Sequence, residues 1–142
     1  MIEVYTDGSC LGNPGKGGWA FLAVQDKRKI EKSGFEINTT NNRMELKAAI
    51  NAILFFKSSS EMKIYTDSNY LKNGITIWIN NWLKNDWRNS QNQIIKNIDL
   101  WKELNYLNSL KKIEWYWVKA HAKNEMNNRV DYLARKAAGS FK

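Results

Sequence analysis

The sequence has one cysteine, one histidine and no long apolar run, and these shortages exclude whole classes of protein. Because Cys10 is the only cysteine in 142 residues, no disulfide can form within the chain, which favours a reducing interior. No apolar run reaches the roughly 18 residues that a membrane span needs. The first residues enter an apolar strand at once, without the basic region and apolar stretch of a signal peptide. We therefore expect a cytoplasmic protein with no membrane partner.

The composition indicates a globular protein with a basic surface. A hydrophobic fraction of 43% suits a packed core, and we expect a single domain over residues 1–142. The chain has 22 basic and 14 acidic residues, a formal net charge of +8. Such a surface favours anionic partners, nucleic acid above all. The alternative explanation is an AT-rich genome, whose codons favour Lys, Asn and Ile. Charge alone leaves both explanations open.

The predicted elements follow the order of a mixed α/β sheet covered by helices. Apolar and β-branched stretches predict strands at 2–6, 19–24, 30–37, 62–66 and 112–118. Helical spacing and polar caps predict helices at 43–56, 68–73, 75–83, 94–107 and 126–138. Glycine is expected to break the first strand at Gly8, to fill a turn at 11–18 and to end a helix at Gly74. The strand at 62–66 follows a helical crossover, so it should run parallel to the first.

Four carboxylates can reach the carboxyl end of the parallel strands, where open α/β sheets place their sites. Asp7 and Asp67 follow two similar strands, Glu45 lies early in the crossover helix, and Asp131 lies in the last helix. Each has an ordinary alternative. Asp7 could belong to a turn, Asp67 could cap a helix, and Glu45 could be a first-turn carboxylate that the helix dipole favours. Asp131 could pair with Arg135 four residues later.

A cluster of carboxylates indicates a site for a hard divalent ion. Oxygen ligands without a thiolate suit Mg²⁺ or Mn²⁺. Like charges this close cannot all stay ionised unaided, so something cationic should lie between them. Two ions about 4 Å apart can activate a water and stabilise the leaving oxygen in phosphodiester hydrolysis. An acidic metal site inside a basic exterior is what a nuclease or a nucleotidyl transferase needs.

In order along the whole chain, five motifs resemble those of bacterial ribonuclease H of type 1. They are Tyr5-Thr6-Asp7-Gly8-Ser9-Cys10 with Gly12-Asn13-Pro14-Gly15, Thr39-Thr40-Asn41-Asn42-Arg43-Met44-Glu45-Leu46, Tyr65-Thr66-Asp67-Ser68, Val118-Lys119-Ala120-His121-Ala122, and residues 127–131. The resemblance implies the ribonuclease H-like fold, a five-stranded mixed sheet of order 3-2-1-4-5 with helices on both faces. It also implies a monomeric endonuclease with no obligate protein partner. The enzyme would use two Mg²⁺, or Mn²⁺ in their place, to cut the RNA strand of RNA–DNA hybrids, leaving 5′-phosphate and 3′-hydroxyl ends.

The resemblance also implies roles for single residues. Asp7, Glu45, Asp67 and Asp131 match the metal-binding carboxylates. His121 matches a histidine that assists proton transfer or product departure, and Asn127 matches a position that orients the attacking water or the histidine loop. The expected substrate-binding residues are Cys10, Asn13, Thr40, Asn41, Asn69, Trp78, Trp82, Lys84 and Arg88.

Hybrid binding has a physical basis in two parts of the chain. Short polar side chains suit a shallow minor groove that displays 2′-hydroxyls, although each of them could equally be a turn or cap residue. By resemblance, Thr40 helps hold a DNA-strand phosphate. Residues 78–96 match a protruding basic handle, where tryptophans interleave with cations. The alternative for Trp78 and Trp101 is a place in the core, which we favour for Trp101.

The chain departs from the family pattern in four places: the handle, Ala120, residues 123–126, where glycine and proline are common, and Tyr132, which replaces a frequent acid and should be tolerated. Asp86 and several amides dilute the handle, which should weaken hybrid binding without changing its mode. Ala120 stands where the family usually has glycine before the histidine, and we expect it to stiffen that loop. Two rival hypotheses are another nuclease of the same fold, such as a junction resolvase or integrase, and a non-catalytic hybrid-binding module.

Overall fold

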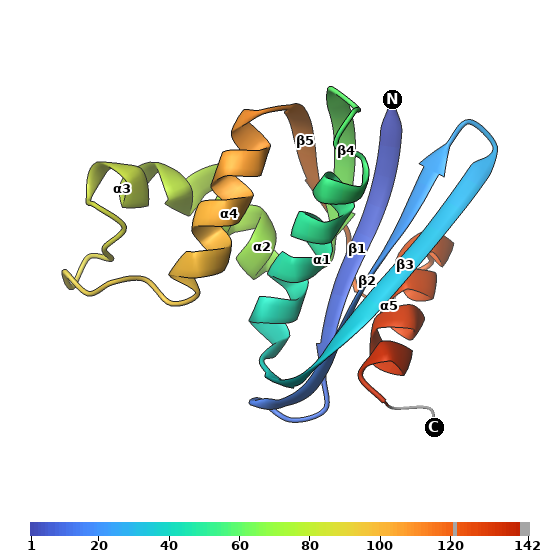
Figure 1. Cartoon of the computed structure of the whole chain (residues 1–142), viewed down its shortest axis with the longest axis horizontal. Coiled ribbons are helices and arrows are strands. Elements are labelled where there is room, and N and C mark those ends of the chain that lie inside the picture. The colour runs from blue at the N-terminus through green and yellow to red at the C-terminus, as the bar shows by residue number, and fades with distance from the viewer. Residues whose placement is uncertain (121, 140–142) are drawn as a thin grey trace.

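A five-stranded mixed sheet forms the centre of the computed structural model, which describes residues 1–120 and 122–139 (Figure 1). The strands are β1 (Ile2–Cys10), β2 (Gly15–Gln25), β3 (Arg28–Thr39), β4 (Glu61–Thr66) and β5 (Lys112–Trp117). Their order is β3-β2-β1-β4-β5, with β1, β2 and β3 antiparallel and with β4 parallel to both β1 and β5. The predicted fold class and strand order are confirmed.

Helices cover both faces of this sheet. They are α1 (Asn41–Phe55), α2 (Asn69–Asn73), a π-helical turn η1 (Gly74–Trp78), α3 (Ile79–Lys84), α4 (Ile98–Ser109) and α5 (Glu125–Ala137). Figure 1 shows α1 and α4 on one side of the sheet and α5 on the other. Within residues 1–120 and 122–139, no helix combines the length and the apolar character needed to cross a membrane.

The main core lies between the sheet and α1 with α4. Helix α1 starts at the cap residue Thr40, whose hydroxyl accepts a hydrogen bond from the Arg43 nitrogen at 3.2 Å. Beyond the cap, its apolar residues recur at helical spacing and are buried against β1. Trp101 on α4 is fully buried, as predicted. A smaller cluster joins α5 to β2 through Ala20, Leu22, Val130 and Ala134.

The first strand does not stop at Gly8, which corrects the prediction. It continues to Cys10 because β2 begins at Gly15 rather than at residue 19, and the two strands stay paired as far as Cys10 and Gly17. The parallel pairing with β4 ends earlier, at Thr6 and Thr66. Gly8 therefore serves a close approach rather than a break: a Cβ there would lie 2.4 Å from the Glu45 nitrogen on α1.

The predicted end of the short helix is confirmed in position, because α2 ends at Asn73 with Gly74 as its cap, but Gly74 does not turn the chain out of its helical path. Gly74 has right-handed helical backbone angles, and the chain passes from α2 through η1 into α3. A Cβ at Gly74 would lie 2.1 Å from the Trp101 ring, so glycine is needed here for packing. The sequence alone does not show whether a glycine ends a helix or strand, or instead leaves room for a close packing contact.

Helix α4 starts at Ile98, four residues later than predicted. Asn97 before it is left-handed, with φ of 60°, and the segment 94–97 is not helical. Ile95 is nevertheless buried, whereas Ile94 is 59% exposed and bridges to Arg88. The apolar spacing therefore continues past the helix because an irregular segment also supplies side chains to the core.

Candidate active site

Three carboxylates meet at the carboxyl end of the parallel strands. Asp7 and Asp67 each follow the last parallel pair, Thr6 with Thr66, and Glu45 comes from the start of α1 above Gly8. Each offers a carboxylate oxygen, and these oxygens all lie within 4.8 Å of one another. Asp7 and Glu45 are buried, and Asp67 is half-buried. Residues 38 and 60 positions away from Asp7 thus form one acidic cluster with it.

The structure excludes most of the ordinary explanations for these three residues. Asp7 is in the middle of β1 rather than in a turn. Ser68 rather than Asp67 caps α2, because its hydroxyl accepts a hydrogen bond from the Leu71 nitrogen at 3.0 Å. Glu45 lies beyond the first turn of α1, where the helix dipole has little effect. Packing and capping therefore leave the cluster unexplained.

Asp131 lies beside the cluster. It is half-buried on α5, and its carboxyl group is close enough to form a hydrogen bond with that of Asp7. The predicted pair with Arg135 is also present, with Nε and Oδ2 3.2 Å apart. Asp131 thus contacts both the cluster and a cation, and it is not one of the three residues whose oxygens lie within 4.8 Å.

The electrostatics of the cluster favour a cation. Burial, then the charges of Glu45 and Asp67, raise the pKa of Asp7 well above its ordinary value. Burial, then the charge of Asp67, raise the pKa of Glu45 in the same way. In addition, Oε1 of Glu45 is buried and has no hydrogen-bond partner among the described residues. A buried carboxylate oxygen without a donor fits a hard divalent ion, because such an ion supplies the missing partner.

Two neighbouring side chains hold Asp67 in place. Asn127, almost fully buried on α5, donates from Nδ2 to Oδ2 of Asp67 at 3.4 Å. Trp117 at the end of β5 donates from its indole nitrogen to the Asp67 carbonyl oxygen at 3.1 Å. Asn124 fixes the start of α5 by accepting a hydrogen bond from the Asn127 nitrogen at 3.0 Å. The predicted residue Asn127 therefore contacts the cluster, and its own Oδ1 finds no partner in the described part of the chain.

Four of the predicted substrate-binding residues gather at the start of α1. Asn13 accepts a hydrogen bond from the Asn41 nitrogen at 3.1 Å, Thr40 is the cap, and the Cys10 thiol donates to the Thr39 carbonyl oxygen at 3.4 Å. The cap and turn alternative for these residues is thus present in the structure. Asn13 and Asn41 also remain exposed, so one surface can do both jobs.

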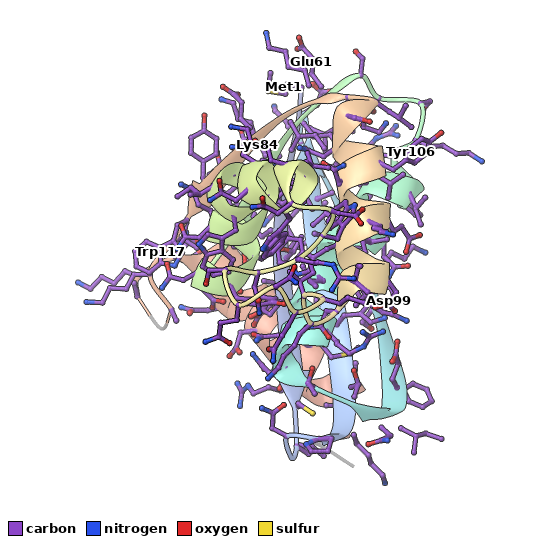
Figure 2. All side chains as sticks on the ribbon, turned by 90° about the vertical axis from the view of Figure 1, so that its left-hand side faces the viewer. Met1, Glu61, Lys84, Asp99, Tyr106 and Trp117 are labelled. Carbon is purple, nitrogen blue, oxygen red and sulfur yellow. The ribbon has the colours of Figure 1, made fainter. Side chains whose placement is uncertain are left out.

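Of the other predicted substrate-binding residues, Asn69 lies on α2, and the handle contains Trp78, Trp82, Lys84 and Arg88. The predicted catalytic residue His121 is outside the described residues. The handle projects from one side of the sheet in Figure 1, and Figure 2 views it from that side, with Lys84 labelled on α3. Trp78, Trp82 and Arg88 line a hollow of about 210 Å³ on it. Lys84 is exposed, Trp78 is 37% exposed, and Asn69 is exposed at the start of α2.

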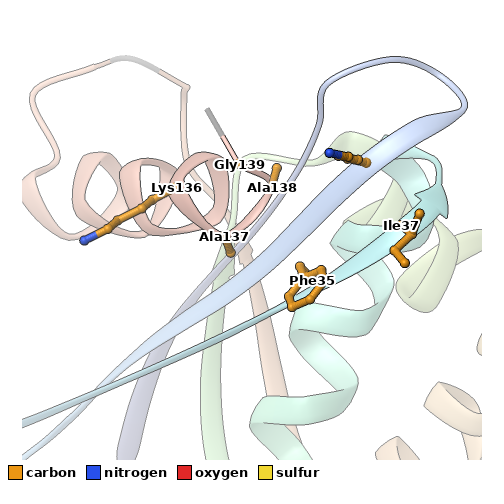
Figure 3. A pocket seen from close by; sticks show the side chains of 7 residues that line it. Phe35, Ile37, Lys136, Ala137, Ala138 and Gly139 are labelled. Atoms are coloured by element: carbon orange, nitrogen blue, oxygen red, sulfur yellow. The ribbon is translucent and has the colours of Figure 1, made fainter. Parts of the chain in front are cut away.

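The acidic cluster does not lie in the larger of the described cavities. A larger hollow of about 470 Å³ lies between β3 and α5 and is lined by Phe35, Ile37 and Ala137 among others (Figure 3). Its wall contains none of the four carboxylates. The acidic cluster is therefore recognised by its chemistry.

Sequence reasoning missed Tyr70, which lies three residues after Asp67 and joins the handle to the core. Its hydroxyl accepts hydrogen bonds from Asn97 at 3.0 Å and from Trp101 at 2.9 Å. These partners lie 27 and 31 residues away along the chain, so the only sequence signal was a tyrosine placed near several tryptophans.

Comparison with known proteins gives a consistent result. The model of the RNase H family matches residues 1–139. The chain is 52% identical over 137 residues to a protein named Ribonuclease H from Wolbachia pipientis wMel, covering 96% of this chain and 94% of that protein. It is 50% identical over 133 residues to one named Ribonuclease HI from Rickettsia conorii (strain ATCC VR-613 / Malish 7), covering 94% and 88%.

Solved structures agree. The crystal structure of LC9-RNase H1, a type 1 RNase H with the type 2 active-site motif, matches with a TM-score of 0.85 at 32% identity and covers 99% of this chain and 73% of that one. LC11-RNase H1, solved in complex with an RNA/DNA hybrid, matches with a TM-score of 0.73. It is 20% identical, covers 99% of this chain and 98% of that one, and shows the fold alone.

Proposed function

This chain belongs to the ribonuclease H family, and we propose that it cuts the RNA strand of RNA–DNA hybrids with two Mg²⁺ bound at Asp7, Glu45 and Asp67. Membership makes it a metal-dependent endonuclease. The observation that carries the metal assignment is the unpartnered Oε1 of Glu45 within a cluster of three carboxylates. Family membership also favours this function over a junction resolvase or a binding module.

The residues of the chain divide the work in this proposal. Asp7, Glu45 and Asp67 would hold the ions, with Asp131 on α5 as the fourth carboxylate. When bound there, Mg²⁺ would supply an activated water and stabilise the leaving oxygen, and we expect 5′-phosphate and 3′-hydroxyl ends. Asn127 orients Asp67 through the hydrogen bond between Nδ2 and Oδ2. His121 assists proton transfer or product departure.

The basic exterior and the handle account for the substrate. Lys84 and Arg88 supply positive charge toward the DNA strand, and the handle tryptophans supply contact area. The polar residues Asn13 and Asn41 at the start of α1 are exposed and suit a minor groove with 2′-hydroxyls. Membership of the ribonuclease H family supports this substrate class.

A cleavage assay on end-labelled RNA tests the proposal. RNA in a hybrid, in double-stranded RNA and in single strands is incubated with Mg²⁺ or EDTA. We expect cleavage of the hybrid alone and only with Mg²⁺, with an initial rate that rises with more than first-order dependence on Mg²⁺. The new 5′ ends should accept label from polynucleotide kinase only after phosphatase treatment.

The matched variants are Asp7→Asn and Asp26→Asn, the latter in the turn between β2 and β3. Asp7→Asn should lower the rate about a thousandfold or more while retaining hybrid binding, because it removes one metal ligand. Asp26→Asn should match wild type. Wild-type cleavage by Asp7→Asn would refute the metal mechanism, and equal cleavage of double-stranded RNA would refute hybrid selectivity.

A further inference from the structure

Tyr70 is the meeting point of three parts of the molecule. It lies on α2, just after Asp67, and its ring contacts the Trp101 ring in the core at 5.3 Å between centroids. On its other side it meets the Trp78 ring edge-on at 5.9 Å, where the handle begins. Its hydroxyl accepts the two hydrogen bonds from Asn97 and Trp101. One side chain thus contacts the core, the first residue of the handle and the residue that follows its end.

Arg43 holds the same point from the opposite helix. It lies on α1, two residues before Glu45, and donates from Nη1 to Oδ1 of Asn97 at 3.2 Å. It also makes a two-pronged ion pair with Asp99 on α4, at 3.0 and 2.8 Å. Asn97 is therefore held between Arg43 and Tyr70. Arg43 lies on α1, the helix that contains Glu45, and Tyr70 lies on α2, the helix that follows Asp67.

The handle has little regular secondary structure. Local hydrogen bonds, such as that from the Trp87 nitrogen to the Trp82 carbonyl oxygen at 2.7 Å, hold its shape, and the Trp82 ring packs on Trp101 at 5.1 Å between centroids. Outside the short helix α3, residues 85–96 are irregular, and three of them have positive φ: Asp86, Trp87 and Asn92. The contacts at its two ends add to these and join the handle to α1 and α2. It enters through Gly74, packed on Trp101, and leaves through Asn97.

We propose that Tyr70 is a positioning residue that, with Arg43 and Asn97, sets the handle at a fixed place relative to the three carboxylates. The inference rests on the proposed function, in which the handle grips the DNA strand of the hybrid. If the handle is misplaced, the hybrid that it holds is shifted, and the RNA phosphodiester is not aligned with Asp7, Glu45 and Asp67. Tyr70 therefore tunes the productive binding of long hybrids and leaves the hydrolytic step itself untouched.

The test compares Tyr70→Phe with wild type on two hybrids. The long hybrid spans the carboxylates and the handle, and the short one is the longest whose KM is unaffected by Lys84→Ala. Tyr70→Phe keeps the ring but leaves the Asn97 and Trp101 donors unpartnered, and one lost hydrogen bond corresponds to about a fivefold change in an equilibrium constant. We expect KM for the long hybrid to rise about fivefold, with kcat and the kinetics on the short hybrid unchanged.

A second pair of variants separates positioning from general stability. Asp99→Asn breaks the ion pair to Arg43, whereas Glu31→Gln breaks an equally two-pronged pair, Arg129 with Glu31, between α5 and β3. Asp99→Asn should raise KM on the long hybrid alone. Glu31→Gln should leave KM unchanged on both hybrids, although its melting temperature should be similar to that of Asp99→Asn.

Three outcomes would overturn the inference. An unchanged KM for Tyr70→Phe on the long hybrid, while Lys84→Ala raises it, would refute the positioning role and leave the proposed function intact. Equal losses on the long and short hybrids would show that Tyr70 acts only through stability. An unchanged KM for Lys84→Ala on every hybrid would refute hybrid binding by the handle, which belongs to the proposed function.

Discussion

Gly8 on β1 lies directly against the backbone of Glu45 on α1, because the glycine leaves the room in which the helix crosses the strand. A Cβ on Gly8 would lie 2.4 Å from both the Glu45 nitrogen and the Met44 carbonyl carbon. These are backbone atoms, which cannot swing aside as a long side chain can. The distance between Asp7 and Glu45 therefore depends on the absence of one methyl group.

Gly8→Ala should disturb the metal site and the fold together. The added methyl must push α1 away from β1, at a cost of about 1–3 kcal/mol of unfolding free energy. We expect a lower urea midpoint and a higher Mg²⁺ concentration for half-maximal cleavage of a hybrid. Ser9→Ala is the neighbouring control, since Ser9 already has a Cβ and is half-buried. Wild-type stability and Mg²⁺ dependence in Gly8→Ala would contradict this account.

The raised pKa values of Asp7 and Glu45 make the stability of the metal-free protein fall as pH rises. Both groups hold a proton more tightly when folded than when unfolded, where their ordinary pKa values are 3.8 and 4.5. The stability that they contribute is full below those values and is lost as pH rises through the folded pKa. Asp99 has the opposite effect and acts at lower pH. Its hydrogen bond with Arg43 lowers its pKa to about 2, so the stability that it contributes is lost as pH falls toward that value.

Melting curves of wild type and Asp7→Asn in EDTA isolate this effect. At pH 8 Asp7→Asn should melt several degrees higher, at about 4 °C per kcal/mol, because it removes a buried charge from the cluster. The difference should shrink on acidification, as wild-type Asp7 takes up its proton. With Mg²⁺ the order should reverse, since the ion stabilises only the intact cluster. A pH-independent difference in EDTA would rule out the repulsion between these carboxylates.

Binding of hybrids should depend steeply on salt, with part of the slope due to the handle. Each phosphate that a cation neutralises releases counterions, so the logarithm of affinity falls linearly with the logarithm of salt concentration. Lys84→Ala should reduce this slope by about 1, and Lys27→Ala, in the distant turn between β2 and β3, should leave it unchanged. The affinities are measured by fluorescence anisotropy on Asp7→Asn protein to prevent cleavage. Equal slopes for the two lysine variants would exclude phosphate contact by Lys84.

The strands, the helices and the acidic cluster were predictable because their signals are local. Asp7 and Asp67 each follow an apolar strand, and the parallel crossover brings the ends of those strands together. The errors concern residues whose role is set by a distant partner. Gly8 faces Glu45 and Gly74 faces Trp101, contacts that residue spacing cannot reveal, so both glycines were read as breaks.

The handle shows the same limit. Asn97 in a left-handed conformation starts α4, and the predicted helix began earlier because Ile94 and Ile95 extend the apolar spacing. The hydroxyl of Tyr70 finds its partners, Asn97 and Trp101, 27 and 31 residues further along the chain. Residue spacing does not identify these partners, because many apolar and aromatic residues in this region have similar spacing.

The central place of β1 bears on when the chain becomes a nuclease. The strand is the first to be synthesised, yet its second neighbour, β4, follows some 50 residues later in the chain. Pairing across such a sequence separation is slow compared with the closing of the β1–β2 hairpin. Until β4 docks, Asp67 is not held beside Asp7 and Glu45, and the acidic cluster is incomplete. A polypeptide that ends before β4 therefore lacks one of the three carboxylates of the acidic cluster, and the cluster is completed only when the second half of the chain folds.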